Sequence, residues 1–316
     1  MHWPHGRQLS FRANRSNCQP TISGDDGIIL TIEIEESNVS LGAKIRGLKL
    51  NALSGKNWIE VHKAFLKYAV LIFPEQHLTQ EEQEEFSTRF GKIEYLVDNL
   101  KTIPLTNKAS NGELYEQDSE WMKLLKGNEG WHTDSSYMPL AAKASILSAR
   151  IVPTTGGETE WADMRAGYEA LDNATQKKIE HLNAYHSYFH SQAKIGHTVK
   201  QGAGYGFNAS DAPLHPLVKT HPETKIPALF IGRHIHIIQG LSEKKTEKLV
   251  AKLTDIACKK GTTLLHKWKP GDLVVWDNRC VLHRALPYPL TEERLMLHTR
   301  VAGDARSERA INHATA

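Results

Sequence analysis

The chain has 316 residues, of which 40% are apolar and 24% are charged, and its formal net charge is +3 at pH 7. This apolar fraction is sufficient for a full hydrophobic core and excludes global disorder, and so small a net charge argues against a nucleic-acid-binding protein with a dense basic surface. No apolar run approaches the roughly 18–20 residues that cross a bilayer, and three cysteines are too few for a disulfide scaffold. We therefore expect a protein of a reducing compartment, the cytoplasm, that binds neither nucleic acid nor membrane.

The two ends of the chain are expected to be tails on either side of one domain, which spans residues 28–305. Residues 1–27 are rich in Arg, Asn, Ser and Pro and show no helical or strand periodicity. Their first acidic residue is Asp25, so the segment weakly resembles a mitochondrial transit peptide, but a flexible N-terminal tail is the interpretation that we favour. Residues 306–316 are predicted to form a C-terminal tail.

The first part of the domain is predicted to hold short strands, two helices and a long polar connection. Hydrophobic patterning predicts strands over 28–32, 45–50 and 70–73, helices over 58–69 and 79–90, and an irregular connection over 96–130. The second helix starts with a capping box, in which Thr79 is followed three residues later by Glu82. A connection as long as 96–130 is unusual unless it covers something.

From residue 144 onward, short apolar strands alternate with turns marked by Pro and Gly. Helices are predicted over 163–171, 174–182 and 242–259, the last with Ser242 as its cap. The stretch 186–216 is the least regular and contains four glycines. We expect a lid-like insertion there, and overall one domain of many short strands with helices packed outside them.

The sharpest local motif is Trp131-His132-Thr133-Asp134. On a helix, side chains two residues apart point in very different directions, whereas on a strand they lie on one face. On a strand, an imidazole and a carboxylate at this spacing can therefore meet one metal ion. The motif makes His132 and Asp134 candidate ligands, although the same pattern also occurs as an ordinary surface pair.

A metal site needs a further ligand, and residues 268–285 are the obvious source. In this segment a Pro-Gly-Asp turn and a buried strand precede His283. Two histidines and one carboxylate on one face leave three coordination positions open, the arrangement of non-haem Fe(II) oxygenases.

Two other pairs are weaker candidates. His234 and His236 also have the alternate spacing of a strand, but no obvious carboxylate is near them in the sequence. Cys280 and His283, three residues apart on a strand, point to opposite faces, so Cys280 is expected to be a small buried side chain rather than a nucleophile.

Four motifs follow one another along the chain: WHTDSSY at 131–137, GGET at 156–159, WDNRCVLHR at 276–284, and an arginine eleven residues after His283, which is Arg294. Together they resemble the iron(II)- and 2-oxoglutarate-dependent oxygenase family of the taurine and 2,4-dichlorophenoxyacetate dioxygenases. The resemblance covers about residues 28–304. It implies a mainly β fold with flanking α-helices and a double-stranded β-helix (jelly-roll, cupin-like) core.

The resemblance also implies a role for individual residues. His132, Asp134 and His283 match the iron ligands of the family, and Thr159 and Arg294 match the groups that hold the distal carboxylate of 2-oxoglutarate. The implied cofactors are Fe(2+), 2-oxoglutarate as cosubstrate and O2. The implied activity is that of a dioxygenase that hydroxylates a small organic molecule and releases succinate and CO2, with cleavage of an ether or C–S bond where the new hydroxyl lies beside one.

The expected substrate residues depart from the family pattern. In relatives that act on sulfonates and phenoxy acids, a second arginine four residues after the first binds the substrate anion, and His298 stands at this position here. Arg300 shares a strand face with His298 and is a candidate replacement. Asn128 matches a family position that lines the substrate pocket. We expect a small organic anion as substrate.

Two other functions stay open at this stage. The chain could be a metal-dependent β-barrel enzyme that does not use 2-oxoglutarate, or a non-catalytic binding protein on the same fold. Thr159 and Arg294 argue against the first, and the complete ligand set argues against the second. The partner that we expect is a small molecule, and the sequence leaves a homo-oligomer open.

Overall fold

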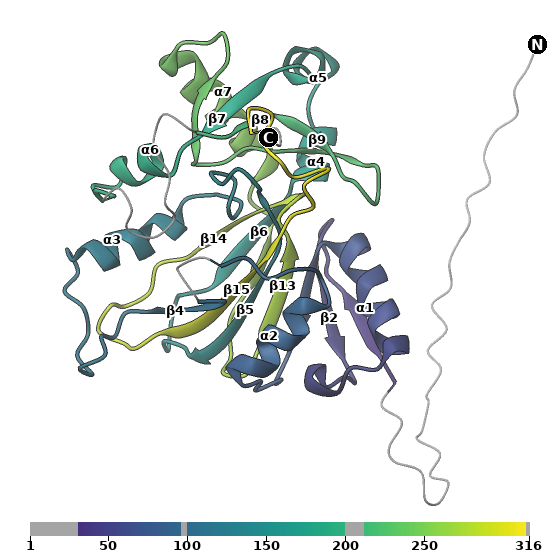
Figure 1. The fold of residues 1–316 in the computed structure, drawn as a ribbon, viewed down its shortest axis with the longest axis vertical. Coiled ribbons are helices and arrows are strands. Elements are labelled where there is room, and N and C mark those ends of the chain that lie inside the picture. The colour runs from purple at the N-terminus through teal and green to yellow at the C-terminus, as the bar shows by residue number, and fades with distance from the viewer. Residues whose placement is uncertain (1–30, 96–99, 200–211, 314–316) are drawn as a thin grey trace, which may run out of the picture. The chain divides into compact units, whose positions relative to one another are not determined.

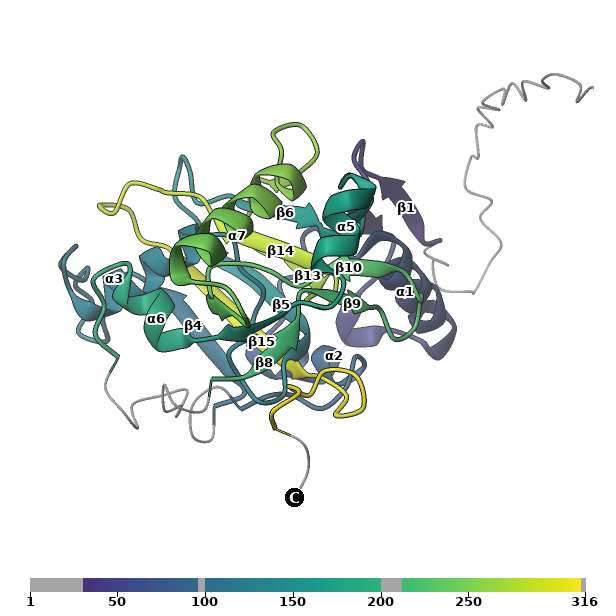
Figure 2. The same cartoon turned by 90° about the horizontal axis from the view of Figure 1, so that it is seen from above.

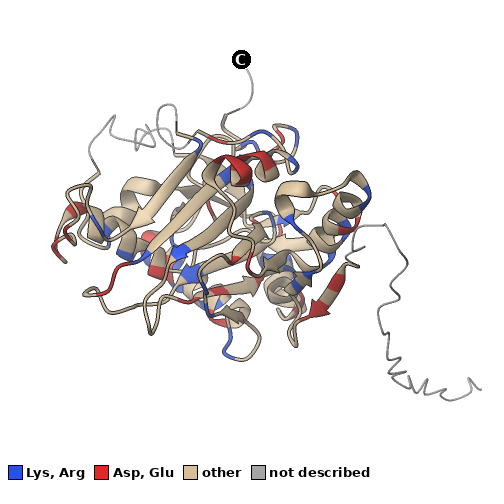
Figure 3. Ribbon diagram, turned by 90° about the horizontal axis from the view of Figure 1, so that it is seen from below, with Lys and Arg blue, Asp and Glu red and all other residues tan. Residues whose placement is uncertain are grey.

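The computed structural model describes residues 31–95, 100–199 and 212–313. The predicted tail over 1–27, most of the predicted strand over 28–32 and the centre of the predicted lid lie outside the described residues. Within the described ranges, no helix has both the length and the apolar character that a membrane span requires. Figure 3 shows Lys and Arg interspersed with Asp and Glu over the ribbon.

The first elements form largely as their local sequence predicts. Helix α1 (Gly55–Tyr68) is capped by Ser54, whose hydroxyl accepts a hydrogen bond from the backbone of Asn57, and it ends where Ala69 takes a left-handed φ of 60°. Strand β3 (Val70–Phe73) follows at once and is buried throughout. Helix α2 (Gln80–Thr88) has the predicted capping box at Thr79 and Glu82. The strand predicted over 45–50 forms earlier, as β2 (Ala43–Arg46), and pairs with β1 (Glu33–Glu36).

The described strands build a jelly-roll core from a large sheet and smaller sheets packed against it (Figures 1 and 2). The large sheet has the strand order β1-β2-β3-β13-β5-β15-β4, and a second sheet has the order β12-β6-β14. The strands not yet bounded are β4 (Thr102–Thr106), β5 (Ala142–Ile151), β6 (Thr159–Asp163), β12 (Leu264–His266), β13 (Leu273–Asp277), β14 (Val281–Ala285) and β15 (Leu295–Ala302). The predicted double-stranded β-helix is therefore confirmed.

Smaller strand pairs and short helices complete the domain. Strand β11 (Ile235–Ile238) pairs with β7 (Asn183–His186), which pairs with β8 (Leu214–Pro216), while β9 (Val218–Thr220) pairs with β10 (Pro227–Leu229). The remaining helices are α3 (Glu120–Lys126), α4 (Met164–Glu169), α5 (Asn173–Ile179), α6 (Tyr188–Ala193) and α7 (Glu243–Ala257), with 3-10 turns η1 (Leu50–Ala52) and η2 (Gly127–Glu129).

Two hydrophobic clusters lie on opposite faces of the large sheet. One contains Trp161 of β6, Trp276 of β13 and Met296 of β15, and so fills the space between the two sheets. The other joins Phe65 of α1 and Phe86 of α2 to the strands beneath them. Helices α1 and α2 thus cover the outer face of the large sheet, and the inner face remains for the site (Figure 1).

The segment over 96–130, which we predicted to be irregular, contains a strand and an α-helix besides the 3-10 turn η2. Strand β4 is the edge strand of the large sheet and pairs with β15, and Pro104 within it is tolerated because an edge strand has a free side. Helix α3 is capped by Ser119, whose hydroxyl accepts from the backbone N–H of Met122. Both elements are short, and neither has a strong periodic signal.

The predicted C-terminal tail is wrong up to residue 313. The backbone N–H of Ala310 donates to Pro139, and that of Ile311 donates to Leu214. The Glu308 carboxylate is buried and pairs with Lys219 at 2.5 Å. These contacts fix the segment against the domain.

Candidate active site

His132 and His283 are brought together by an isolated antiparallel β-bridge. The backbone N–H of His132 donates to the carbonyl of His283 at 3.0 Å, and the reverse bond measures 2.8 Å. Their ring centroids are 4.2 Å apart. Asp134 follows His132 at a turn in which Ser135 has a φ of +53°.

One potential ligand atom from each of His132, Asp134 and His283 lies within 4.8 Å of the others. The Nε2 atom of His132 is 4.0 Å from Oδ1 of Asp134, and that of His283 is 3.7 Å from Oδ2. All three side chains are buried. Two imidazoles and a carboxylate therefore converge on one point in the interior.

The hydrogen bonds fix the chemical state of this cluster. Nδ1 of His132 is 2.7 Å from the carbonyl of Gly130, which makes Nδ1 the donor and leaves a lone pair on Nε2, the atom that faces Asp134. Burial lowers the pKa of His132 to about 4 and holds the pKa of His283 well below its usual value. Both rings are therefore neutral at pH 7, as metal ligands must be.

Asp134 is held as a carboxylate by its neighbours. Burial alone would raise its pKa, but the positive charge of the nearby Arg300 guanidinium holds the pKa well below the usual value. Nη2 of Arg300 is 3.2 Å from Oδ1, and Nε2 of His298 is 3.5 Å from Oδ2. The hydroxyl of Ser145 donates to Oδ2 at 2.6 Å.

All the predicted site residues line one pocket beside this cluster. They are Asn128, His132, Asp134, Thr159, His283, Arg294, His298 and Arg300. The walls of the same pocket include the apolar side chains of Ile103, Leu105, Leu124, Leu147, Trp276 and Ala285. The pocket therefore combines polar and apolar side chains, as small-molecule sites commonly do.

Arg294 reaches the pocket from a different sheet than His283. The prolines between the two residues suit an antiparallel hairpin, but β14 and β15 lie in different sheets, so the connection crosses from one layer to the other. Arg294 immediately precedes β15, and its backbone N–H donates to the side-chain oxygen of Asn107 at 2.8 Å. The two residues lie on separate layers that both line the pocket.

The side chain of Arg294 is buried and makes few hydrogen bonds. Nη2 donates to the carbonyl of Gly157 at 3.4 Å, while Nε has no hydrogen-bond partner among the described residues. The guanidinium lies 5.6 Å from the ring centre of Tyr288. Thr159 lines the same pocket, and its hydroxyl oxygen accepts from the indole N–H of Trp268 at 2.9 Å, which orients the hydroxyl. A buried guanidinium without an anion is suited to a ligand carboxylate.

Sequence reasoning did not select several polar residues of the pocket, which are Tyr137, Tyr188, Gln192, Arg233 and His234. His234 was considered only as half of a metal pair with His236. The structure separates the two: His234 is buried and its Nδ1 is 2.8 Å from the Ser191 hydroxyl, whereas His236 is exposed and stacks on His190. His234 precedes β11, and the register of β11 shifts between Ile235 and Ile237, so the alternate spacing does not make the two rings a metal pair.

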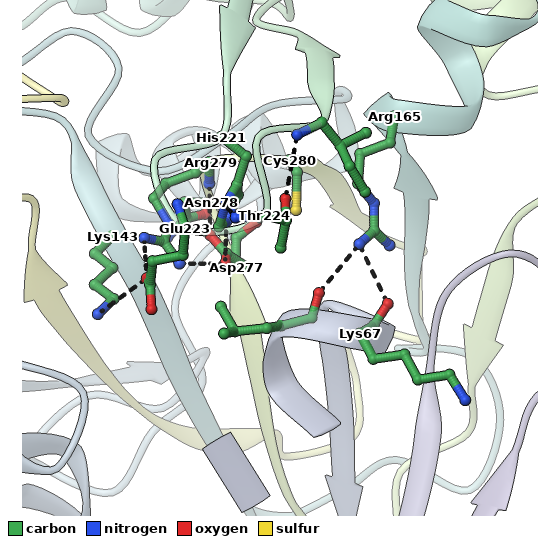
Figure 4. A network of polar contacts seen from close by, with 12 residues as sticks. Lys67, Lys143, Arg165, His221, Glu223, Thr224, Asp277, Asn278, Arg279 and Cys280 are labelled. Carbon is green, nitrogen blue, oxygen red and sulfur yellow. Dashed lines mark hydrogen bonds and ion pairs between the residues drawn. The ribbon is translucent and has the colours of Figure 1, made fainter. Parts of the chain in front are cut away.

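A second cluster of potential ligand atoms is formed by His221, Asp277 and Cys280 (Figure 4). Nδ1 of His221 accepts from two backbone N–H groups that follow it in the chain, so Nε2 carries the proton and donates to Asp277 at 3.1 Å. Arg279 forks onto the same carboxylate at 2.7 and 2.6 Å. The lone pair that a metal would need is already used, so this cluster is a structural network at the end of β13.

Comparison with known proteins gives consistent matches over nearly the whole domain. The family model described as "Taurine catabolism dioxygenase TauD, TfdA family" matches residues 33–300. The chain is 45% identical over 287 residues to the (S)-phenoxypropionate/alpha-ketoglutarate-dioxygenase of Sphingobium herbicidovorans, covering 89% of this chain and 98% of that protein. It is 34% identical to the alpha-ketoglutarate-dependent 2,4-dichlorophenoxyacetate dioxygenase of Cupriavidus pinatubonensis, covering 80% and 91%.

Solved structures give the same result. The crystal structure of AAD-2 in complex with Mn(II) and N-oxalylglycine is similar with a TM-score of 0.80 and 35% identity, covering 89% of this chain and 99% of that one. A putative alpha-ketoglutarate-dependent 2,4-D dioxygenase from Burkholderia xenovorans is similar with a TM-score of 0.73 and 29% identity, covering 88% and 100%.

Proposed function

The chain belongs to the TauD/TfdA dioxygenase family, and from this premise we propose that His132, Asp134 and His283 bind its Fe(II) and that Arg294 and Thr159 bind its 2-oxoglutarate. The protein is an oxidoreductase, an iron(II)- and 2-oxoglutarate-dependent dioxygenase that acts on a small molecule. Family membership removes both alternatives, the barrel enzyme without 2-oxoglutarate and the non-catalytic binding protein.

The observation that carries the metal assignment is the convergence of three potential ligand atoms, one each from His132, Asp134 and His283. Nε2 of His132 is free of a proton because Nδ1 donates to Gly130, and it faces the ionised carboxylate of Asp134. A neutral imidazole and a carboxylate are the forms that bind Fe(II). When bound, the iron supplies the redox chemistry that couples oxidation of 2-oxoglutarate to hydroxylation of the substrate.

The cosubstrate assignment is supported by the unsatisfied donor of Arg294. A guanidinium presents N–H groups in a fork that matches a carboxylate, and this one is buried within the pocket that contains the metal ligands. The Thr159 hydroxyl oxygen already accepts from Trp268, so its own hydrogen is available to donate to the same carboxylate. The protein therefore orients the cosubstrate, and the burial of the site excludes water from it.

For the substrate we propose a carboxylic acid with an aryl ether, cleaved after hydroxylation beside the ether oxygen. Support comes from the apolar part of the pocket, which suits an aromatic ring, and from the relatives named for phenoxypropionate and 2,4-dichlorophenoxyacetate. A location in the cytoplasm and the formation of a homo-oligomer stay predictions from the sequence.

Succinate release is the test of this function. The purified protein with Fe(II), 2-oxoglutarate and ascorbate is incubated with (S)-2-phenoxypropionate, its (R) enantiomer, 2,4-dichlorophenoxyacetate, taurine and a medium-chain alkyl sulfate. We expect succinate from at least one phenoxy acid, together with the corresponding phenol and a 2-oxo acid, the two fragments left when the hydroxylated ether splits. Succinate from taurine or the alkyl sulfate alone would contradict the substrate class, and an absence of any Fe(II)- and 2-oxoglutarate-dependent absorption band under anaerobic conditions would contradict the site.

The Arg294→Gln variant tests the cosubstrate site separately. Loss of one partner of a buried charge pair costs about 2–5 kcal/mol, so the 2-oxoglutarate concentration for half-maximal band formation should rise by roughly 30-fold or more. If the half-maximal 2-oxoglutarate concentration were the same for the variant and the wild type, the cosubstrate carboxylate would have to bind another cation of the pocket.

A further inference from the structure

The guanidinium of Arg300 connects two carboxylates, and the proposed function uses only one of them. On one side, Nη2 is 3.2 Å from Oδ1 of Asp134, the proposed metal ligand. On the other side, Nη1 is 3.2 Å from the hydroxyl oxygen of Ser135, which in turn lies 2.8 and 3.0 Å from the two carboxylate oxygens of Glu94. A chain of polar contacts thus joins Glu94, which has no assigned role, to the metal ligand.

The hydrogen bonds of this chain run in one direction. A guanidinium can only donate, so the oxygen of Ser135 accepts from Arg300, and the hydroxyl proton of Ser135 is left for Glu94. The hydroxyl oxygen of Tyr137 also accepts from Nη1, at 3.3 Å. Successive hydrogen bonds of this kind polarise one another. The charge of Glu94 therefore acts on the same guanidinium as the charge of Asp134.

The backbone holds Glu94 beside Arg300. The N–H of Glu94 donates to the carbonyl of Arg300 at 2.9 Å, and the preceding Ile93 forms an antiparallel bridge with Val301. The hydroxyl between them belongs to a residue without freedom to move, because Ser135 is fully buried and has a left-handed φ of +53°. The contact is therefore built by the fold and not by long side chains that happen to meet at the surface.

Arg300 has two opposite effects on a metal site at Asp134. It keeps the carboxylate ionised, but it also competes with a metal ion for the charge of that carboxylate. A second carboxylate that draws on the same guanidinium weakens this competition. Glu94 is partly buried, and although burial raises its pKa, the charge of Arg300 and the hydroxyl of Ser135 oppose the rise.

We propose that Glu94 is a positioning residue of the metal site, which shares the charge of Arg300 through Ser135 and so keeps Asp134 a strong ligand. The proposal rests on the proposed function and adds to it a residue that no pocket position reveals, since Glu94 is not among the residues that line the pocket. Without the charge of Glu94, the guanidinium would pair more completely with Asp134, and the metal would be held less tightly.

Calorimetric titration with Mn(II) tests the proposal without turnover. The proteins are the wild type, Glu94→Gln, Arg300→Gln and the double variant, and urea unfolding shows that each is folded. Glutamine at position 94 keeps an oxygen that accepts from Ser135, so this variant removes the charge and leaves the hydrogen bond. If Glu94→Gln does not fold, Ser135→Ala replaces it, because it interrupts the chain of contacts while both carboxylates stay.

Glu129→Gln is the matched control for the loss of a negative charge. Glu129 is also partly buried, and burial raises its pKa. It precedes His132 by three residues, but the charge that acts on it is that of Lys126. A general effect of charge near the metal ligands would therefore appear in this variant as well.

We expect Glu94→Gln to lower the Mn(II) affinity by about ten-fold, the smaller end of what loss of a group around a metal ligand costs, while Glu129→Gln binds like the wild type. In the Arg300→Gln background the same change should have no further effect, because the charge that Glu94 shares is gone. The anaerobic Fe(II)- and 2-oxoglutarate-dependent absorption band should move to shorter wavelength in Glu94→Gln, since a weaker carboxylate donor leaves the metal less electron-rich.

Three results would overturn the proposal: an unchanged Mn(II) affinity in Glu94→Gln, or in Ser135→Ala where it is used instead; an equal loss in Glu129→Gln; and a loss of the same size in the Arg300→Gln background. The last would mean that Glu94 acts directly through space or on the fold. Failure of the proposed function looks different, because the wild type would then bind neither Mn(II) nor 2-oxoglutarate.

Discussion

Ser145 on β5 and Asn278, which directly follows β13, orient the carboxylate of Asp134. The amide of Asn278 donates to the hydroxyl of Ser145 at 2.8 Å, and that hydroxyl donates to Asp134 at 2.6 Å. The amide oxygen of Asn278 accepts from the indole N–H of Trp276 at 3.0 Å, which fixes the amide. The position of the proposed ligand is therefore set by strands β5 and β13.

The variant Ser145→Ala should weaken metal binding while the fold is retained. Removal of a group that orients a metal ligand typically lowers metal affinity by about 10–100-fold, and we expect this loss for Mn(II) in calorimetric titration. Ser148→Ala is the matched control, because Ser148 is also buried on β5 but donates to Gln83. Asp134→Ala removes the proposed ligand itself, so it should give the weakest Mn(II) binding of the series, and hydroxylation should be abolished. Equal losses in both serine variants would show that the effect is one of sheet stability.

Individual site residues were predictable where the chemistry is local. The alternate spacing of His132 and Asp134 and the motif around His283 pointed to three residues that the structure brings together. Arg233 gave no signal, because its place in the pocket depends on how the chain packs in three dimensions. His298 and Arg300 were selected as substrate residues, but their contact with Asp134 arises only when β15 packs across the pocket.

At the level of elements, strong local signals predicted α1, β3, α2 and α7 to within a few residues. Short elements with weak periodicity, such as β4 and α3, were missed. The step from β14 to β15 was also beyond local reasoning, because the sequence between them contains turn residues that suit a hairpin and a crossing between sheets equally well. Which one forms is decided by the partners of each strand, β6 for β14, and β5 and β4 for β15.

The loop before β6 depends on Gly156, which has a φ of +74°. A Cβ atom at this position would collide with the carbonyl oxygen of Pro287, in the segment that joins β14 to β15. The loop also carries Gly157, whose carbonyl accepts from Arg294. The glycine thus permits both the left-handed backbone and the close approach of two loops beside the pocket.

Gly156→Ala should therefore destabilise the fold by more than the strain of its backbone. Gly196→Ala is the control, since Gly196 has a φ of +75° and nothing within 4 Å of an added Cβ. We expect a loss of about 1 kcal/mol for the control, and of about 2–4 kcal/mol for Gly156→Ala, in urea unfolding. Similar losses would mean that the Pro287 loop moves aside without cost.

Across the whole molecule, composition predicted one well-filled domain but not how its last residues pack. The segment after residue 305 is polar, and its attachment uses backbone hydrogen bonds and the buried Glu308–Lys219 pair, neither of which leaves a hydrophobic pattern. The many histidines are a second global feature. Several are buried, including His186 and His215, whose rings are 5.4 Å apart.

Buried neutral histidines make the stability of the whole molecule depend on pH. Burial lowers the pKa of His186 to about 3, while in the unfolded chain an unperturbed histidine titrates near 6.5. Between these two pH values the unfolded state binds a proton that the folded state does not. The free energy of unfolding therefore falls as the pH decreases from 6.5, and it stops falling only when the folded state is protonated as well.

Replacing His186 with Leu should remove one of the protons that the chain takes up on unfolding below pH 6.5. The free energy of unfolding of the ligand-free protein, measured in urea at pH 7 and pH 5, should fall by about 2 kcal/mol less in His186→Leu than in the wild type, because each pH unit below 6.5 costs about 1.4 kcal/mol per such histidine. Other buried histidines, among them His215 and His234, have pKa values lowered by the same cause and keep a residual slope in the variant. If the free energy of unfolding fell equally in the two proteins between pH 7 and pH 5, His186 would already be protonated in the folded state at pH 5. We do not expect this, because its ring is packed between those of His215 and Phe230, with ring centroids 5.4 Å from each.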